Sequence, residues 1–386
     1  MNKKKILTII LIILFIGFVA ERINTNKSNV YEEQNKNSIK KNKNLLSMNL
    51  EQTAGAGDYK TVTQSKWPTE GYKFNTELSR CENGSEISWD DTKKAVIMQG
   101  NVSDKCYVYF DIYQPTLAEY IKSQYTGTQG DNALYYHNST LTNGAGDNSY
   151  RYAGASDSVN NYICLGSDAA TCPDANLFRI IGVFGDKTKV IRANSVGDLK
   201  WHTSSSNTWS SSSLNTYLNG TYLTRLGTIA DKIATTTWKV GGGSWSNIAT
   251  SVPKTAYQNE VGSNASTTTV DKKIGLMYVS DYYYGASPSA WTLVGFNSSD
   301  ATKDYRAATS TNWLYLGSYE WTISRISDRT NDAFGVSSTG NVYHYIVTNS
   351  YAVRPSFNLE SSITYISGDG TIEKPIRINW YTVDIL

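Results

Sequence analysis

The stretch Phe178-Arg179-Ile180-Ile181-Gly182-Val183-Phe184 is followed, four residues later, by Lys189-Val190-Ile191-Arg192-Ala193. Both runs are rich in β-branched and aromatic side chains, which favour extended backbone. The four residues between them, Gly185-Asp186-Lys187-Thr188, are polar and begin with the Gly-Asp pair typical of turns. The two runs therefore predict a pair of strands that meet at a polar turn.

Helices are expected on either side of this strand pair. Residues 116–122 carry apolar side chains at helical spacing, and Thr116 with Glu119 resembles a capping box. Residues 213–220 show the same spacing, and Gly220 is expected to end that helix. Long polar loops broken by short apolar runs make up most of the remainder. This pattern predicts an α+β fold, mostly β, with few helices and long loops.

A small β-module is predicted ahead of this domain, over residues 52–113. Short alternating runs such as 106–112 are separated by turn-rich segments such as 82–85, a pattern typical of strands and hairpins. Gln114-Pro115 interrupts the alternation. We therefore place the domain boundary there and assign residues 114–386 to the second domain.

The chain has four cysteines, at positions 81, 106, 164 and 172. An even number in an exported chain suggests disulfides, and three pairings are formally possible. The simplest pairing joins sequence neighbours, Cys81 with Cys106 and Cys164 with Cys172. The first bridge would stabilise the β-module, which is too small to be secure without one. A zinc site is disfavoured because the sequence has no C-x-x-C motif and only three histidines.

The N-terminus has the pattern of an export signal. Three lysines at positions 3–5 precede the uncharged, apolar run 6–20, and they hold the N-terminus inside the cell. As a helix this run would span roughly 22 Å, less than the hydrocarbon core of about 30 Å, which favours a signal peptide. A cut after Ala20 would place Phe18 where a small residue is expected, which favours an uncleaved anchor. We expect a signal anchor in the membrane, with the C-terminus outside, and leave a cleaved, secreted form open.

Residues 21–51 are rich in Asn, Lys, Ser and Gln and are expected to form a disordered basic spacer. Residues 1–50 hold nine Lys or Arg against three Glu, a net charge of +6. Because the whole chain carries +2, the remaining 336 residues carry −4. The folded part has no basic surplus to neutralise phosphates, so we expect no nucleic-acid partner.

The order of segments between positions 176 and 359 resembles that of a known protein family. These segments are residues 177–183, the Leu-Asn-x-Tyr-Leu-Asn-Gly helix at 214–220, residues 274–277, Tyr319-Glu320-Trp321-Thr322, and Val353-Arg354-Pro355-Ser356-Phe357-Asn358-Leu359. The set resembles Gram-positive bacterial surface proteins whose C-terminal domain is similar to the C-type-lectin-like fold. Formylglycine-generating enzymes and variable phage and bacterial receptor-binding proteins share that branch. The resemblance covers about half of the chain and implies a C-type-lectin-like second domain.

Four residues of these segments are expected to have structural roles. Trp321 and Phe357 would be buried core residues. Glu320 and Arg354 are suitably placed to form a partly buried ion pair if their two strands are neighbours. We interpret that pair as structural and not as catalytic.

Aromatic clusters are the strongest indication of a binding site. Large rings occur in segments that look too polar and too rich in glycine to be core strands. The candidate ligand-binding residues are Trp201, Trp209, Tyr282, Tyr283, Tyr284 and Trp291. Exposed rings can stack on sugars or serve as contact points in protein interfaces. The competing interpretation is that these rings cover the core beneath long loops.

Catalytic chemistry has less support. The formylglycine-type reaction requires a reactive cysteine pair or a metal late in the domain, and no cysteine follows Cys172. His202 and His344 stand outside any nucleophile-elbow motif, and His344 lies in an ordinary alternating run. Residues 328–332 are the nearest calcium candidate, whereas residues 368–370 are better explained as a hairpin turn. We expect no metal and no cofactor.

The sequence as a whole predicts a membrane-tethered extracellular adhesin or ligand-binding protein that is not an enzyme. It would be held in the membrane through residues 6–20 and would recognise a glycan or protein of a host or neighbouring cell. Two alternatives stay open. One is a cell-envelope hydrolase whose carboxylate pair cannot be recognised in sequence, and the other is a structural, pilin-like surface subunit.

Overall fold

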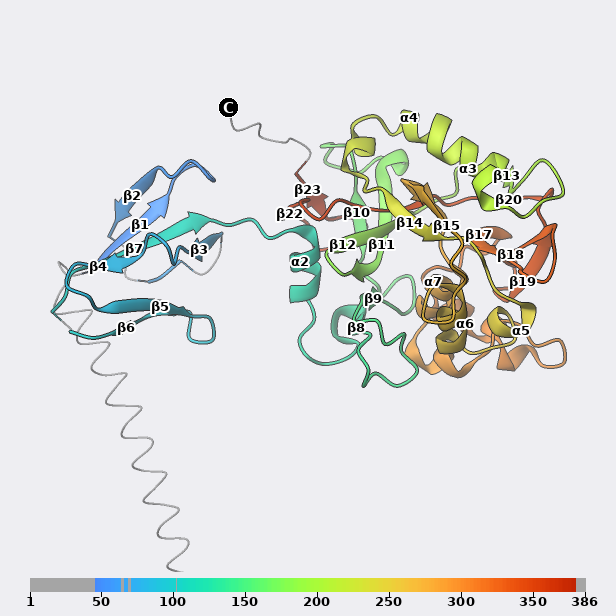
Figure 1. The fold of residues 1–386 in the computed structure, drawn as a ribbon, viewed down its shortest axis with the longest axis horizontal. Helices are drawn as coiled ribbons and strands as arrows, with labels where there is room; N and C mark the ends of the chain where they lie inside the picture. The colour runs from blue at the N-terminus through green and yellow to red at the C-terminus, as the bar shows by residue number, and fades with distance from the viewer. Residues whose placement is uncertain (1–45, 64–65, 69–70, 102, 380–386) are drawn as a thin grey trace, which may run out of the picture. The chain divides into compact units, whose positions relative to one another are not determined.

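The protein is α+β and mostly β, as the sequence predicts, and its chain divides into two compact units, up to Gln114 and from Pro115 onward (Figure 1). The computed structural model describes residues 46–63, 66–68, 71–101 and 103–379. The predicted export segment and the start of the predicted spacer lie outside the described residues. No helix in the described ranges is both long and apolar enough to span a bilayer.

The first unit is a five-stranded sheet with an additional hairpin. The strands are β1 (Leu46–Glu51), β2 (Tyr59–Val62), β3 (Tyr72–Phe74), β4 (Arg80–Cys81), β5 (Glu86–Asp90), β6 (Ala95–Gln99) and β7 (Cys106–Ile112). The sheet order is β2-β1-β7-β3, with β4 also paired to β7, and β5 pairs with β6. The Cys81–Cys106 disulfide joins directly opposite residues of β4 and β7, so the predicted pairing is confirmed.

Strand β1 corrects the predicted extent of the spacer. Residues 46–51 were expected to be disordered, yet they form a strand between β2 and β7, parallel to β7. Leu46, Met48 and Leu50 alternate with polar residues, and Met48 and Leu50 are buried together with Phe110. This period-two pattern is short and adjoins a lysine- and asparagine-rich stretch, whose polar composition conceals it.

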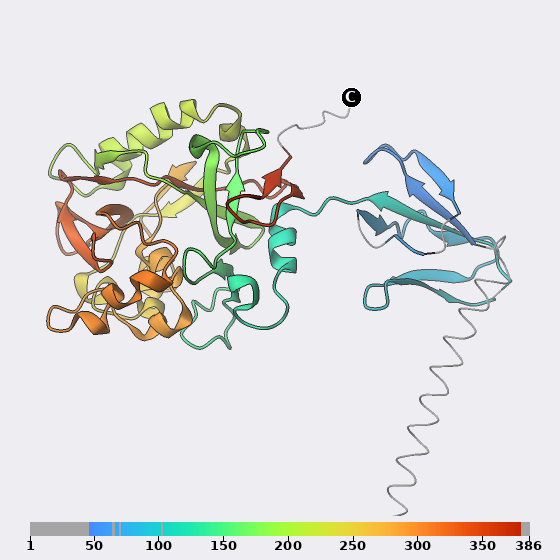
Figure 2. The ribbon, with the colours of Figure 1, turned by 180° about the vertical axis from the view of Figure 1, so that it is seen from behind.

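The second unit contains two larger sheets, seen from behind in Figure 2. Its strands are β8 (Leu134–Tyr136), β9 (Tyr150–Tyr152), β10 (Tyr162–Cys164), β11 (Leu177–Phe184), β12 (Lys187–Arg192), β13 (Asp198–Lys200), β14 (Thr236–Lys239), β15 (Thr269–Lys272), β16 (Ile274–Gly275), β17 (Glu320–Arg325), β18 (Asp332–Val336), β19 (Val342–Ile346), β20 (Ser350–Ala352), β21 (Ser356–Asn358), β22 (Tyr365–Ser367) and β23 (Arg377–Ile378). One sheet has the order β16-β21-β12-β11-β9-β8, with β10 also on β11, and the other has the order β13-β20-β17-β18-β19.

Helical segments pack around these sheets. They are α2 (Leu117–Ser123), α3 (Ser213–Tyr217), the π-helical η4 (Leu218–Tyr222), α4 (Leu223–Arg225), α5 (Trp245–Ile248), α6 (Pro253–Glu260) and α7 (Val279–Tyr284). Short 3-10 helices are η1 (Asp131–Ala133), η2 (Asp174–Asn176), η3 (Trp209–Ser211), η5 (Gly227–Lys232), η6 (Pro288–Thr292), η7 (Ala301–Lys303) and η8 (Tyr305–Thr311). In Figure 1, α3 and α4 lie on one side of the unit, and α5, α6 and α7 lie together on the other.

The predicted strand pair forms β11 and β12 at the centre of the larger sheet, and Gly185 turns the chain with a φ of 67°. A register shift lies between Ile180 and Gly182. A Cβ atom at Gly182 would overlap the carbonyl oxygen of Tyr150 on β9, so only glycine permits this close approach.

The helix predictions are confirmed at one place and corrected at another. Thr116 and Glu119 form the capping box of α2. The helix that starts after Ser212 does not end at Gly220 but continues through η4 and α4 to Arg225. Because Gly220 does not adopt a positive φ among the described glycines, it does not provide the left-handed cap that would end the helix.

Two other predictions concern the ends of the second unit. Cys164 and Cys172 form the second disulfide, so this predicted pairing is also confirmed. Residues 368–370 lie between the paired strands β22 and β23, as expected for a hairpin turn.

The predicted ion pair between Glu320 and Arg354 forms, and it is more deeply buried than expected. Arg354 Nε donates to Glu320 Oε1 at 2.7 Å and its Nη2 donates to Oε2 at 2.8 Å. Both side chains are almost fully buried, as are Trp321 and Phe357. Arg354 lies between β20 of one sheet and β21 of the other, so the pair fixes the place where the chain passes between the two sheets.

Removing one partner of this pair should destabilise the protein strongly. Glu320→Ala leaves the Arg354 guanidinium buried without its counter-charge, and we expect a loss of about 3–5 kcal/mol in the free energy of unfolding. The double variant Glu320→Met/Arg354→Met should recover most of that loss, because no charge stays buried. Urea unfolding of the three proteins measures both values. A Glu320→Ala variant as stable as the wild type would contradict the assigned role.

A second group of buried charges links β9, β12 and α7. Lys189 Nζ lies 2.5 Å from Asp281 Oδ2, and Arg151 Nη2 lies 2.6 Å from Asp147 Oδ2. Arg151 also approaches Asp281 at 3.9 Å. The Lys189 ammonium lies over the ring of Tyr278, with 4.7 Å to the ring centroid. Two cations and two carboxylates balance, so no net charge is buried here.

His137 adjoins this group and is fully buried. Its Nδ1 accepts a hydrogen bond from the Ala145 backbone, and its ring packs against Tyr284 and Trp291. Burial first, and the positive charge of Arg151 second, lower the pKa of His137 well below its ordinary value. The folded protein therefore keeps this imidazole neutral, whereas the unfolded chain binds a proton below about pH 6.5.

Stability should therefore fall as the pH drops below about 6.5. The unfolded state binds one more proton than the folded state there, so the free energy of unfolding decreases by up to about 1.4 kcal/mol per pH unit from this group. His137→Gln, which keeps an acceptor but cannot be protonated, should have a smaller dependence between pH 6.5 and 5. Urea unfolding at several pH values tests this. Identical pH dependence of the two proteins would refute the assignment.

Candidate functional site

The six predicted ligand-binding rings lie in the core, so the prediction that they are exposed is wrong. Trp201, Trp209, Tyr282, Tyr283, Tyr284 and Trp291 are each at most 1% exposed. The three tyrosines lie on α7, a helix whose six residues are all buried. Burial raises the pKa of Tyr282 and Tyr283 well above the ordinary tyrosine value.

Backbone carbonyls accept from the polar atoms of five of the six rings, whereas the buried indole N–H of Trp209 has no hydrogen-bond partner among the described residues. Tyr282 donates to the carbonyl of Gly340, and Tyr283 donates to that of Ile248. The indole of Trp201 donates to the carbonyl of Thr322 at 3.0 Å. Polar, glycine-rich flanking sequence therefore indicates long loops over the core here and does not indicate surface rings.

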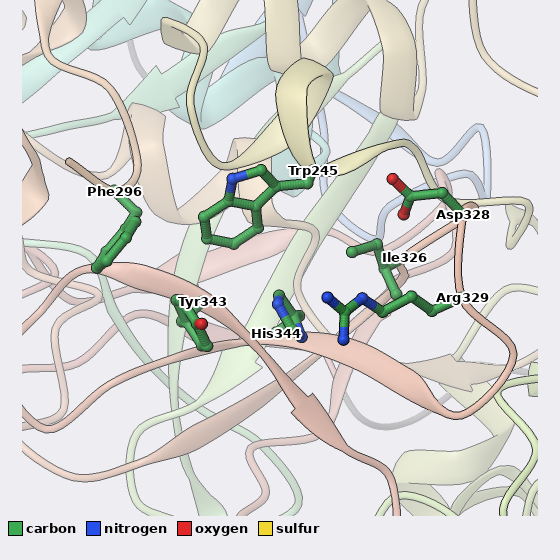
Figure 3. A pocket seen from close by; sticks show the side chains of 7 residues that line it. All are labelled: Trp245, Phe296, Ile326, Asp328, Arg329, Tyr343 and His344. Carbon is green, nitrogen blue, oxygen red and sulfur yellow. The ribbon is translucent and has the colours of Figure 1, made fainter. Parts of the chain in front are cut away.

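A different set of aromatic residues surrounds a pocket with a volume of about 470 Å³. Its lining comprises Trp245, Phe296, Ile326, Asp328, Arg329, Tyr343 and His344. Figure 3 shows the four rings around one side of the opening and Asp328 with Arg329 on the other. The volume lies in the range typical of small-molecule sites, which combine apolar walls with a few polar groups.

The aromatic wall is a set of rings that meet edge to face. The Trp245 ring centroid lies 5.0 Å from that of Tyr343 and 5.5 Å from that of Phe296. Phe296 and Tyr343 are 5.1 Å apart. All three side chains are partly exposed, and Arg306 lies over the Phe296 ring. Edge-to-face contacts of this kind fix ring orientation.

Backbone hydrogen bonds join the segments that line the pocket. Ser327 donates to the carbonyl of Gly243, next to the start of α5. Phe296 donates to Ala249 at the end of α5, and Val342 on β19 donates to Gly295. The pocket is therefore held by ordered backbone, which is the condition for a precise binding site.

His344 lines the pocket and is paired with the buried Asp332, which is not itself among the lining residues. His344 Nδ1 lies 2.7 Å from Asp332 Oδ2, and Arg329 donates to the same oxygen at 3.3 Å. Because a carboxylate can only accept, Nδ1 carries the hydrogen of this bond, and Nε2 is left for a ligand. The hydrogen bond of His344 to a described residue runs from Nδ1, so Nε2 could bond to a ligand.

Asn207 holds the loop that carries Asp328 and Arg329. Its side-chain amide lies 2.8–2.9 Å from the carbonyl oxygens of Ile326, Arg329 and Asp332. Its backbone N–H also donates to Thr330 at 2.7 Å. Asn207 is 2% exposed, so its bonds are shielded from water.

The other predicted candidates have different surroundings. His202 is partly exposed and lies beside Ser204. In the calcium candidate, residues 328–332, the buried Asp332 is already bonded to His344 and Arg329. Within the described part of the chain, no group of three or more His, Cys, Asp or Glu residues could hold a metal ion.

Sequence reasoning missed this pocket. Its rings come from α5, the loop after η6 and β19, and these three segments are far apart in the sequence. The contacts of Asn207 span more than 100 residues. Of the lining residues, His344 was considered as a catalytic histidine, and Asp328 and Arg329 lay, with Asp332, in the segment considered for calcium.

The comparisons with known proteins cover the pocket but do not assign its role. Residues 185–361 match the model of a family described as a domain of unknown function, DUF6273. All seven lining residues fall within that match. No curated protein and no solved structure matches the chain. The family match gives no support to the resemblance to C-type-lectin-like proteins.

Replacing Asn207 should loosen the pocket loop. Asn207→Ala leaves three buried carbonyls without their donor, and we expect a loss of about 1–3 kcal/mol in stability. Amide hydrogen exchange over residues 326–332 should become faster. Ser206→Ala, at the preceding and less buried position, is the matched control. Unchanged exchange in Asn207→Ala would show that the loop does not depend on this amide.

Proposed function

We propose that the protein is an extracellular carbohydrate-binding protein, tethered to the membrane by its N-terminal segment, and that the pocket around Trp245 is its binding site. The observation that carries this proposal is the combination of three partly exposed rings with Asp328, Arg329 and His344 around one pocket.

The chemistry of a sugar matches these groups. A sugar ring presents an apolar face of C–H groups, which can pack on Trp245 or Tyr343, and a rim of hydroxyls. Those hydroxyls can donate to Asp328 or to His344 Nε2 and can accept from Arg329. A stable protein interface buries about 800 Å² on each partner, whereas this pocket has the volume of a small-ligand site.

Two features support an extracellular location. Both disulfides join cysteines that would stay reduced in most cytosolic proteins. The sequence pattern of residues 1–20 is that of an export signal. The lectin-like resemblance of the sequence is part of the same proposal, and a domain of two sheets with long loops is compatible with it.

The pocket offers fewer of the groups that a hydrolase would need. Glycoside hydrolysis uses two carboxyl groups that flank the scissile bond, and Asp328 is the single carboxylate among the described lining residues. Asp332 and His344 resemble two members of a catalytic triad, but the described lining offers no serine or cysteine nucleophile. Binding without turnover therefore fits the site better.

Replacing pocket residues should abolish sugar binding without loss of the fold. On a glycan array, we expect Trp245→Ala to weaken binding at least about tenfold, because the stacking face is lost. Asp328→Asn changes an exposed carboxylate and tests the polar contact without loss of packing. Circular dichroism checks that each variant is folded.

The matched control is Tyr107→Ala, which removes a partly exposed ring of the first unit. It should bind as the wild type does. The proposal would be contradicted if the wild-type protein bound no glycan on the array. It would also be contradicted if the wild type and Trp245→Ala bound the same glycans equally well.

A further inference from the structure

A second group of rings lies on the sheet β13-β20-β17-β18-β19, which contributes Tyr343 and His344 to the pocket. Tyr319 precedes β17 and is 42% exposed. Its ring stacks with that of Tyr351 on β20 at 5.0 Å, with an interplanar angle of 22°. Tyr345 on β19 meets both rings edge-on, at 5.5 Å from Tyr319 and 5.1 Å from Tyr351. We call Tyr319, Tyr345 and Tyr351 the tyrosine platform.

The tyrosine platform packs against the buried residue Trp321. Trp321 is fully buried, lies 4.8 Å from Tyr351, and donates its indole N–H to the carbonyl of Leu199. A Cβ atom at Gly335, opposite Trp321 in β18, would lie 3.2 Å from the Tyr345 ring. The glycine therefore leaves room for that ring across the sheet.

The tyrosine platform is continuous with the pocket. Tyr343 and Tyr345 are two residues apart on β19 and so point to the same face of the sheet. Their ring centroids are 5.6 Å apart, and Tyr343 contacts Trp245 and Phe296 in the pocket wall. A row of rings therefore runs from Trp245 through Tyr343 and Tyr345 to Tyr351 and Tyr319.

We propose that the pocket and the tyrosine platform form one extended site for a linear oligosaccharide, with one sugar in the pocket and later sugars along the platform. This inference rests on the proposed function and adds the length of the ligand. The ring of Tyr319 contacts those of Tyr345 and Tyr351, neither of which lines the pocket. A single sugar would leave the platform without a role.

The groups on and around the tyrosine platform suit a sugar chain better than a protein partner. Tyrosines combine an apolar ring with a hydroxyl, and Asn349 already donates to the hydroxyl of Tyr351. The neighbouring residues Lys200 and Ser350 are exposed and polar. A protein interface would have a more apolar centre, depleted in charged residues.

A length series tests this inference. Glucose oligomers and N-acetylglucosamine oligomers of one to six units, together with any series that the array retains, are titrated into the full-length protein by calorimetry. We expect affinity to rise about tenfold or more from the single sugar to the longest chain. Tyr319→Ala should weaken binding of the long chains about tenfold and leave the single sugar unchanged.

Ile366→Ala is the matched control. Ile366 is 50% exposed on β22, which belongs to a different sheet, and its loss should change neither affinity. Affinity that is independent of chain length, or unchanged long-chain binding in Tyr319→Ala, would overturn the extended site while leaving sugar binding in the pocket intact. Failure of every sugar, single or linked, would overturn the proposed function as well.

Discussion

The ion pair between Glu320 and Arg354 is the interaction on which the second unit most depends. Burial of a charge is costly unless a partner and hydrogen bonds compensate it, and here two short hydrogen bonds join the two groups. Arg354 also donates to the carbonyl of Leu314 at 2.6 Å. The pair therefore requires β17 to lie next to the segment that passes from one sheet to the other.

The pocket and the tyrosine platform follow from that arrangement. β17 begins at Glu320, carries Trp321 beneath the tyrosine platform, and leads into the loop that contains Asp328 and Arg329. β18 and β19 are added beyond β17 at the edge of the same sheet. Both proposed parts of the binding site thus use residues of this sheet, and α5 and the loop after η6 add Trp245 and Phe296 to the pocket.

Local patterns predicted much of the fold but little of the site. The β11–β12 pair, the capping box of Thr116 and the neighbouring cysteine pairs depend on residues close in sequence, and each was predicted. Gly220 was expected to end a helix but does not, because tertiary packing decides whether a helix continues past glycine. The polar surroundings of Tyr283 and Trp291 suggested exposure, whereas both are buried and donate to backbone carbonyls, Tyr283 to Ile248 at a distance of 35 residues in sequence and Trp291 to the nearby Ala286.

The proposed function depends on the packing of sugar C–H groups on the rings of Trp245 and Tyr343. Saturation-transfer NMR with the tightest-binding oligosaccharide tests it most directly, because protein rings pass saturation only to ligand protons that touch them. We expect strong transfer to the protons of one sugar face in the wild type and loss of that pattern in a folded Trp245→Ala variant. Transfer of equal strength and pattern in both proteins would contradict it.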